Sequence, residues 1–131
     1  LRVDFPGGWE GDKLNLFDEK QRTGDAAIVS DYTRRLLQWR KTKEVIHTGR
    51  TMHFMSRDNT YAFFRYNDGE AVFVFANASE DNRTIPTAHY AEILGKYNPV
   101  GVDVISGKTY DLSKKDIVIA PLSSIVVKLA K

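Results

Sequence analysis

Hydrophobic residues between positions 25 and 45 recur at steps of three and four, which is the spacing of one face of an α-helix. The stripe consists of Ile28, Val29, Tyr32, Leu36, Leu37 and Trp39. Charged and polar residues fall largely on the opposite side, and Gly49 follows as a natural stop. The pattern predicts one long amphipathic helix over residues 25–45.

After Gly49 the period drops to two, which is typical of strands. The predicted strands are residues 50–55, 61–66, 71–76, 102–105, 108–112, 116–119 and 124–129. Asn67-Asp68-Gly69 predicts a tight hairpin, in which an Asp-Gly pair supplies the positive φ that such turns need. Residues 61–64 and 72–75 are apolar on both faces, which predicts central strands covered on both sides. Residues 88–97 have helical spacing and predict a short helix or turn.

These elements together predict a mainly β fold, a Greek-key β-sandwich preceded by one long amphipathic helix. Residues 1–24 have no period and include the break Pro6-Gly7-Gly8. Ordering such a loop costs about 1–2 kcal/mol per residue in backbone entropy, so it normally lies on a scaffold. We therefore expect the chain to be the severed C-terminal end of a larger protein.

Composition excludes several classes of function. The 131 residues carry 19 basic and 17 acidic side chains, interleaved, with a net charge of +2, which argues against a nucleic-acid partner. The absence of cysteine excludes disulfides and thiolate metal sites. No apolar run approaches the roughly 20 residues that span a bilayer. The compartment stays open between periplasmic, secreted and cytoplasmic placement.

Four segments resemble the C-terminal end of an α-amylase family glycoside hydrolase, nearest the neopullulanase and cyclomaltodextrinase branch. They are Arg2-x-Asp4-Phe5-Pro6-Gly7-Gly8-Trp9, residues 36–41 with 47–49, residues 61–77, and residues 103–108 with 119–124. The resemblance implies that residues 1–49 are a remnant of a catalytic (β/α)8 barrel, with its last loop and final helix. Residues 50–131 are then the C-terminal β-sandwich domain.

The resemblance also implies a parent enzyme that cleaves α-1,4 links in starch, maltodextrin or cyclodextrin with retention of configuration. Its nucleophilic Asp, acid/base Glu and transition-state Asp belong to earlier barrel strands, and none of those motifs occurs in this chain. We therefore expect no catalytic residue, metal site or cofactor in this segment, which should be inactive alone. Whether the parent binds calcium stays open.

An acidic cluster, Asp4, Glu10 and Asp12, lies on the first loop. Retaining glycoside hydrolysis needs two carboxyl groups held about 5–5.5 Å apart, and an unsupported loop cannot hold them so. Solvated or loop-bracing roles are favoured. The resemblance implies that Arg2 and Asp4 reach sugar hydroxyls; the alternative is an Arg–Asp pair that shapes the loop. Trp9 either stacks on a sugar face or packs under the loop.

Tyrosines of the β region have two interpretations, a surface sugar platform or half-buried packing. They are Tyr66, Tyr90, Tyr97 and Tyr110. Two segments, Asn77-Ala78-Ser79 and Asn82-Arg83-Thr84, match the glycosylation pattern. That pattern is common by chance, and the relatives that the resemblance implies are bacterial, so we discount it.

The helix stripe separates two interpretations of the chain. As an accessory domain of a starch-degrading hydrolase, it would pack Val29, Tyr32, Leu36 and Trp39 against the missing catalytic barrel. As a stand-alone carbohydrate-binding or interaction module, it would cover the stripe with its own sheet or by self-association. Burial of such side chains is worth about 1.5–3 kcal/mol each, so the stripe must be covered in either case.

Overall fold

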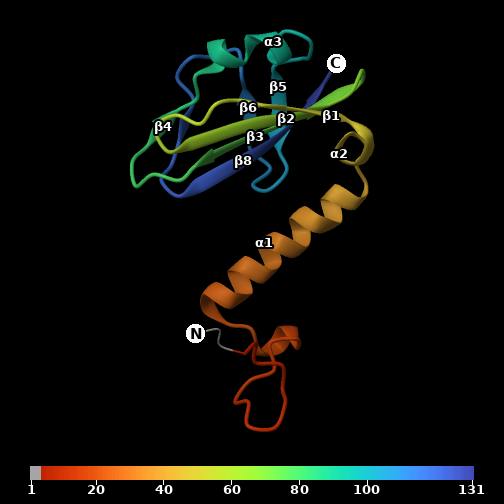
Figure 1. Cartoon of the computed structure of the whole chain (residues 1–131), viewed down its shortest axis with the longest axis vertical. Helices are drawn as coiled ribbons and strands as arrows, with labels where there is room; N and C mark the ends of the chain where they lie inside the picture. Colours follow the sequence, from red (N-terminus) through yellow and green to blue (C-terminus); the bar gives the residue numbers. More distant parts are fainter. Residues whose placement is uncertain (1–3) are drawn as a thin grey trace. The chain divides into compact units, whose positions relative to one another are not determined.

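The computed structural model describes residues 4–131, and the chain divides into two units, Leu1–Gln38 and Trp39–Lys131. The first unit contains an irregular loop, the 3-10 helix η1 (Glu19–Gln21) and most of helix α1 (Gly24–Lys41) (Figure 1). The second unit holds all the strands. The predicted domain boundary between residues 49 and 50 stays a prediction.

The predicted helix is present as α1, but it ends at Lys41, and a separate short helix, α2 (Glu44–Thr48), follows. The break has a local cause. The Thr42 hydroxyl donates to the Trp39 carbonyl over 2.9 Å, a side-chain bond that competes with regular helical pairing. Lys43 is then extended, with φ −114° and ψ 106°. None of the residues of α1 is buried.

The second unit is mostly β, as predicted. One antiparallel sheet has the order β1-β2-β3-β8-β5-β6, and β4 pairs with β7 in a separate ribbon. The strands are β1 (Arg50–His53), β2 (Thr60–Tyr66), β3 (Glu70–Asn77), β4 (Arg83–Thr84), β5 (Val100–Asp103), β6 (Thr109–Asp111), β7 (Val118–Ile119) and β8 (Ser123–Ala130). The return of β8 to pair with β3, past the intervening strands, is a Greek-key connection.

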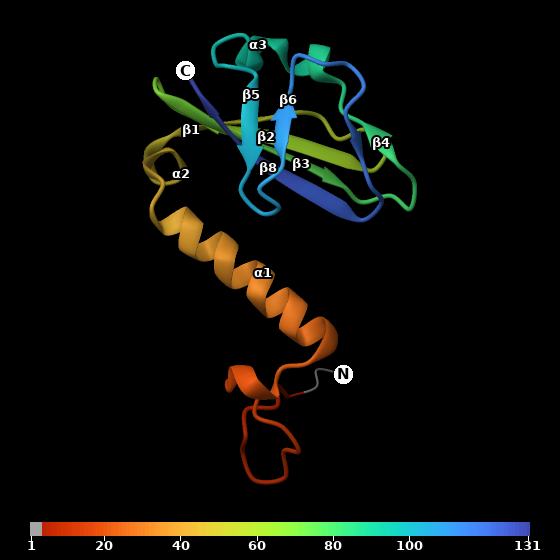
Figure 2. The same ribbon diagram turned by 180° about the vertical axis from the view of Figure 1, so that it is seen from behind.

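The pairing of β5 with β8 is short, since the register joins only Val102 to Lys128 and Asp103 to Val127. Figure 2 shows β5 and β6 running across β2, β3 and β8. The sheet is therefore bent between β8 and β5. The two groups of strands enclose one apolar core between them, as in the predicted sandwich.

The hairpin between β2 and β3 is present at the predicted turn, with Tyr66 opposite Ala71. The prediction of a positive φ at Gly69 is wrong, because Gly69 does not adopt one. The side-chain oxygen of Asn67 closes the turn by accepting the backbone N–H groups of Gly69 and Glu70, each at 2.9 Å. An asparagine side chain that replaces a backbone turn bond removes the need for a left-handed residue.

Aromatic side chains dominate the core. Phe64, Phe73 and Phe75 are fully buried, and the rings of Phe64 and Phe73 stack with centroids 4.6 Å apart. The strand β3 is covered on both sides at Val72, which is 1% exposed. The same expectation for β2 holds on one face only, because Tyr61 on the other face is 39% exposed.

A helical segment covers one end of the sheet, as the sequence predicts for residues 88–97. It consists of the 3-10 helix η2 (Thr87–Tyr90) and helix α3 (Ala91–Leu94) (Figure 1). The buried Tyr90 ring lies 4.8 Å from the Phe54 ring and 5.4 Å from the Phe73 ring, centroid to centroid. These contacts place the segment firmly on the core.

Buried polar side chains join strands that are distant in sequence. The Asn77 amide donates to the carbonyls of Asp81 at 2.8 Å and Ala120 at 2.9 Å, and its oxygen accepts from Ser79. Because Asn77 is 2% exposed, its side chain is not accessible for glycosylation, whereas Asn82 of the second motif is exposed, so our discounting of the second motif stays a prediction. Asp103, equally buried, accepts the backbone N–H of Val126 at 2.8 Å.

Candidate functional site

The loop at the start of the first unit is organised around one carboxylate. Three successive backbone N–H groups, those of Gly7, Gly8 and Trp9, donate to Oδ2 of Asp12 at 2.9, 3.1 and 3.1 Å. Hydrogen bonds to a charged acceptor are stronger than neutral ones. Gly8 has φ +81°, a left-handed conformation that glycine adopts without strain. Asp12 is therefore a loop brace, which confirms the bracing interpretation for this member of the acidic cluster.

A second polar centre, Arg22, fastens the base of the loop to the helix. Its guanidinium donates to the Leu16 carbonyl at 2.7 Å, to the Phe17 carbonyl at 3.1 Å and to the Ser30 hydroxyl at 2.9 Å. The backbone N–H of Leu16 also donates to the Pro6 carbonyl at 2.8 Å. Asp12 and Arg22 together give an irregular segment a defined path.

This braced loop presents an exposed aromatic cluster of Phe5, Trp9 and Phe17. Their exposed fractions are 50%, 62% and 64%. The Phe5 and Phe17 ring centroids lie 4.9 Å apart, and the Trp9 ring meets Phe17 edge-on at 6.1 Å. The Trp9 indole lies against Gly7, where any Cβ would collide with the ring. The indole is thus held in place, yet most of it remains in contact with solvent.

The residues proposed for sugar contact have different outcomes. Arg2 lies outside the described residues, so the Arg2–Asp4 pair stays a prediction. Asp4 is exposed and forms no hydrogen bond or ion pair within residues 4–131. Trp9 is exposed rather than covered by its loop. Sequence reasoning did not select Phe5, Phe17 or Arg22, although the apolar residues at positions 14, 16 and 17 of the unperiodic loop were a usable signal.

The four tyrosines with two interpretations pack against the core instead of forming a platform. Tyr90 and Tyr97 are buried, and Tyr66 and Tyr110 are partly buried against the core cluster. Burial raises the pKa of Tyr90 above its ordinary value, against a smaller opposing effect of Arg57. The burial of these four tyrosine side chains confirms the packing interpretation.

The described part of the chain places no three histidine or acidic side chains where they could share a metal ion. None of the helices found in residues 4–131 is long and apolar enough to cross a bilayer. The braced loop offers polar contact and aromatic stacking.

Comparison with known proteins gives one family match. The model of the cyclo-malto-dextrinase C-terminal domain matches residues 51–128. These residues are more than half of the chain and cover its β region.

Solved structures share the same fold. An Anoxybacillus α-amylase is 18% identical, with TM-score 0.64, over 83% of this chain and 23% of that chain. The structure of AmyP with maltotriose is 21% identical, with TM-score 0.63, over 93% of this chain and 23% of that chain. A Bacillus licheniformis trehalose-6-phosphate hydrolase is 27% identical, with TM-score 0.60, over 75% of this chain and 18% of that chain. The chain thus spans about a fifth of the length of the proteins that it matches.

Proposed function

The chain belongs to the cyclo-malto-dextrinase C-terminal domain family, and on this premise we propose that it is the non-catalytic C-terminal part of an α-glucan hydrolase. The parent would cleave starch, maltodextrin or cyclodextrin by double displacement, with retention of configuration, using carboxylates outside this chain. Two matched proteins support this class, an α-amylase and a protein crystallised with maltotriose.

The observation that carries the proposal is the uncovered apolar face of α1. Ile28 is 67% exposed, Val29 62% and Leu37 49%. Burying such side chains stabilises a protein by about 1.5–3 kcal/mol each, so a helix of this composition is suited to a neighbour. We assign that neighbour to the catalytic barrel of the parent, packed on Val29, Tyr32, Leu36 and Trp39.

Sequencing the reading frame upstream of Leu1 tests this assignment. We expect codons for a barrel with two catalytic carboxylates, and hydrolysis of maltoheptaose by the longer protein but not by the 131-residue chain. In the longer protein, Val29→Asp should lower stability, whereas Gln38→Asp, at an exposed position on the opposite side of the helix from the apolar stripe, should not. A reading frame without a barrel would overturn the proposal.

The same exposed face also suits the alternative, a stand-alone module whose helix meets a second copy. Sedimentation of the 131-residue chain at several concentrations should then show a dimer that Val29→Asp dissociates. Calorimetry with maltoheptaose, against cellohexaose as control, separates a sugar-binding module from a purely structural one. A heat of binding with maltoheptaose, and none with cellohexaose, supports binding of α-glucan.

Substrate contact by the braced loop forms a separate part of the proposal. Trp9 offers an exposed ring that matches the apolar face of glucose, and Asp4 offers a carboxylate to sugar hydroxyls, with Arg2 beside it in sequence. In a Trp39→Phe background, Trp9 is the remaining tryptophan. Maltoheptaose should change its fluorescence, and cellohexaose should not. An equal response to both sugars would contradict the contact.

A further inference from the structure

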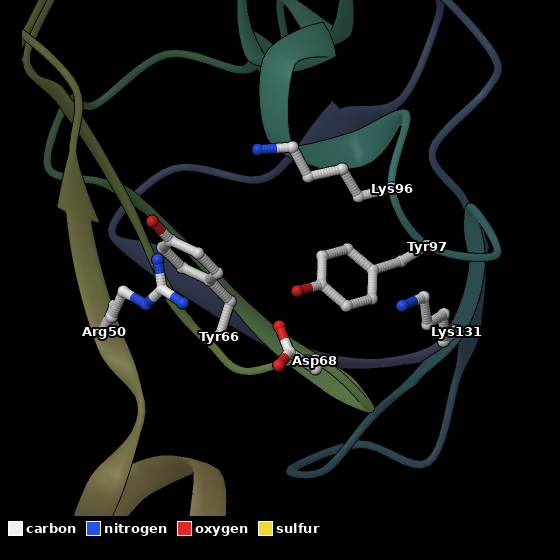
Figure 3. A pocket seen from close by; sticks show the side chains of 6 residues that line it. All are labelled: Arg50, Tyr66, Asp68, Lys96, Tyr97 and Lys131. Atoms are coloured by element: carbon white, nitrogen blue, oxygen red, sulfur yellow. The ribbon is translucent and has the colours of Figure 1, made fainter.

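A cavity of about 320 Å³ lies within the β unit, apart from the braced loop, and it gathers six side chains (Figure 3). They are Arg50, Tyr66, Asp68, Lys96, Tyr97 and Lys131. These residues come from the beginning of β1, the β2–β3 hairpin, the segment after α3 and the residue after β8. The fold therefore brings together charged groups that are far apart in sequence.

The lining of this cavity is positive. Arg50, Lys96 and Lys131 line it together with a single side-chain carboxylate, Asp68, and with the α-carboxylate of Lys131 in the 131-residue chain counted, an excess of one positive charge remains. None of the three cations forms an ion pair within the described residues. Elsewhere in the same unit a lysine is paired, since Nζ of Lys128 lies 3.2 Å from Oε2 of Glu70. Cations that line one hollow without an ion-pair partner create a local attraction for anions.

The aromatic walls do not offer free faces for a neutral sugar. The Arg50 guanidinium lies over the Tyr66 ring, 5.9 Å from its centroid, and Tyr66 also packs against the core. Tyr97 is 9% exposed, and its hydroxyl donates to the Asn67 carbonyl at 2.5 Å. Burial and next Asp68 raise the pKa of Tyr97, against an opposing effect of Arg50. The rings shape the cavity while the charged groups provide the recognition.

We propose that this cavity binds a sugar phosphate. The phosphate group would lie among Arg50, Lys96 and Lys131, which can donate charge-assisted hydrogen bonds to its oxygens. Asp68 can accept hydrogen bonds from sugar hydroxyls, but it repels a bare phosphate ion. The mixed lining therefore favours a phosphate monoester that carries hydroxyl groups over inorganic phosphate. This proposal does not rest on the proposed function, because the site belongs to the β unit alone.

Titration of the 131-residue chain, followed by the backbone amide signals in NMR, tests the site with three probes. Glucose-6-phosphate should shift the amides of Asp68, Gly69 and Tyr97, and glucose should leave them in place. Inorganic phosphate should bind more weakly than glucose-6-phosphate. Absence of shifts with glucose-6-phosphate, or shifts confined to other parts of the chain, would overturn the proposal, and equal affinity for both phosphates would reduce the site to one for simple anions.

Variants sharpen the test. Arg50→Gln and Lys131→Gln should each weaken glucose-6-phosphate binding by about two- to fivefold, the range expected for one exposed charge contact. Lys115→Gln, which removes a lysine outside the cavity, is the matched control and should have no effect. Asp68→Asn should strengthen binding of inorganic phosphate and reduce the preference for the sugar ester. If Lys115→Gln weakened binding as much as Lys131→Gln, the attraction would be a property of overall charge and the site would be wrong.

Discussion

The two units of this chain reach order by different means. The β unit buries phenylalanines such as Phe64 and Phe73 completely, whereas residues 4–38 include no buried residue and expose Trp9 and Phe17. Hydrogen bonds converging on Asp12 and Arg22 shape the first unit. Apolar burial scales with the area removed from water, while exposed polar bonds contribute little net stability. The β unit therefore has the means to fold by itself, whereas the first unit is shaped by polar bonds at its surface.

The largest expected loss of stability comes from a substitution in the β core. Phe73→Ala should lower the free energy of unfolding by about 3–5 kcal/mol, because it removes a fully buried ring and leaves a cavity. Phe17→Ala, at an exposed ring of the first unit, should change it by no more than about 0.5 kcal/mol. Urea denaturation followed by near-UV circular dichroism measures both. Similar losses for the two variants would break the contrast between the units.

Loss of the buried amide of Asn77 should cause the second largest decrease in the free energy of unfolding. Asn77→Ala removes the bonds of its amide to the carbonyls of Asp81 and Ala120 and leaves the buried backbone N–H of Ser79 without its acceptor, and a buried group left unpaired costs about 1–3 kcal/mol. The control is Asn82→Ala, at an exposed position nearby, which should be close to neutral. Urea denaturation again gives the comparison, and equal midpoints for the two variants would contradict a role for this network.

A smaller and local effect is expected from Asp12→Ala. Removing the shared acceptor should release the N–H groups of Gly7, Gly8 and Trp9, at a cost of about 0.5–1.5 kcal/mol confined to the loop. Hydrogen exchange of these amides should accelerate, while exchange in β3 should be unchanged. Glu10→Ala is the matched control, since Glu10 accepts no bond within the described residues. A loop unaffected by Asp12→Ala would show that the brace is unnecessary.

The smallest effect concerns acid pH. The Ser113 hydroxyl and, next, the Ser113 backbone N–H bond to Asp111 and hold the pKa of its carboxyl below the ordinary value of 3.8. A lowered folded-state pKa means that the stabilisation is present above the ordinary value and is lost as pH falls through the lowered pKa. Ser113→Ala should raise the pKa of Asp111 toward 3.8. Carboxyl NMR titration measures this, and an unchanged pKa would show that the hydroxyl has no role.

Much of the β unit could be predicted because strand formation leaves a local signal. Alternating apolar residues located β2, β3 and β8 to within a residue or two at each end. The ribbon strand β4 has only two residues, too few to display a period. The turn at Gly69 was predicted for the wrong reason, because composition cannot show whether a side chain, here that of Asn67, will replace the left-handed backbone.

The sites were less predictable. The family resemblance selected Asp4, and the match of an aromatic ring to a sugar face selected Trp9, but the brace by Asp12 depends on the left-handed backbone at Gly8. The cavity that Arg50, Lys96 and Lys131 line has no local sequence pattern, because these positions come to one pocket only after the sheet has formed. Contacts of this kind follow from topology, which single residue spacings do not contain.

The close approach of the Trp9 indole to Gly7 has an evolutionary consequence. Any side chain at position 7 would occupy the space of the ring, so the effect of a substitution there depends on what stands at position 9. Neighbouring positions that share space show such non-additive effects. Lineages that gain a larger residue at position 7 are expected to have lost the indole first, which makes the order of the two changes, and not only their identity, a record of how this loop diversified.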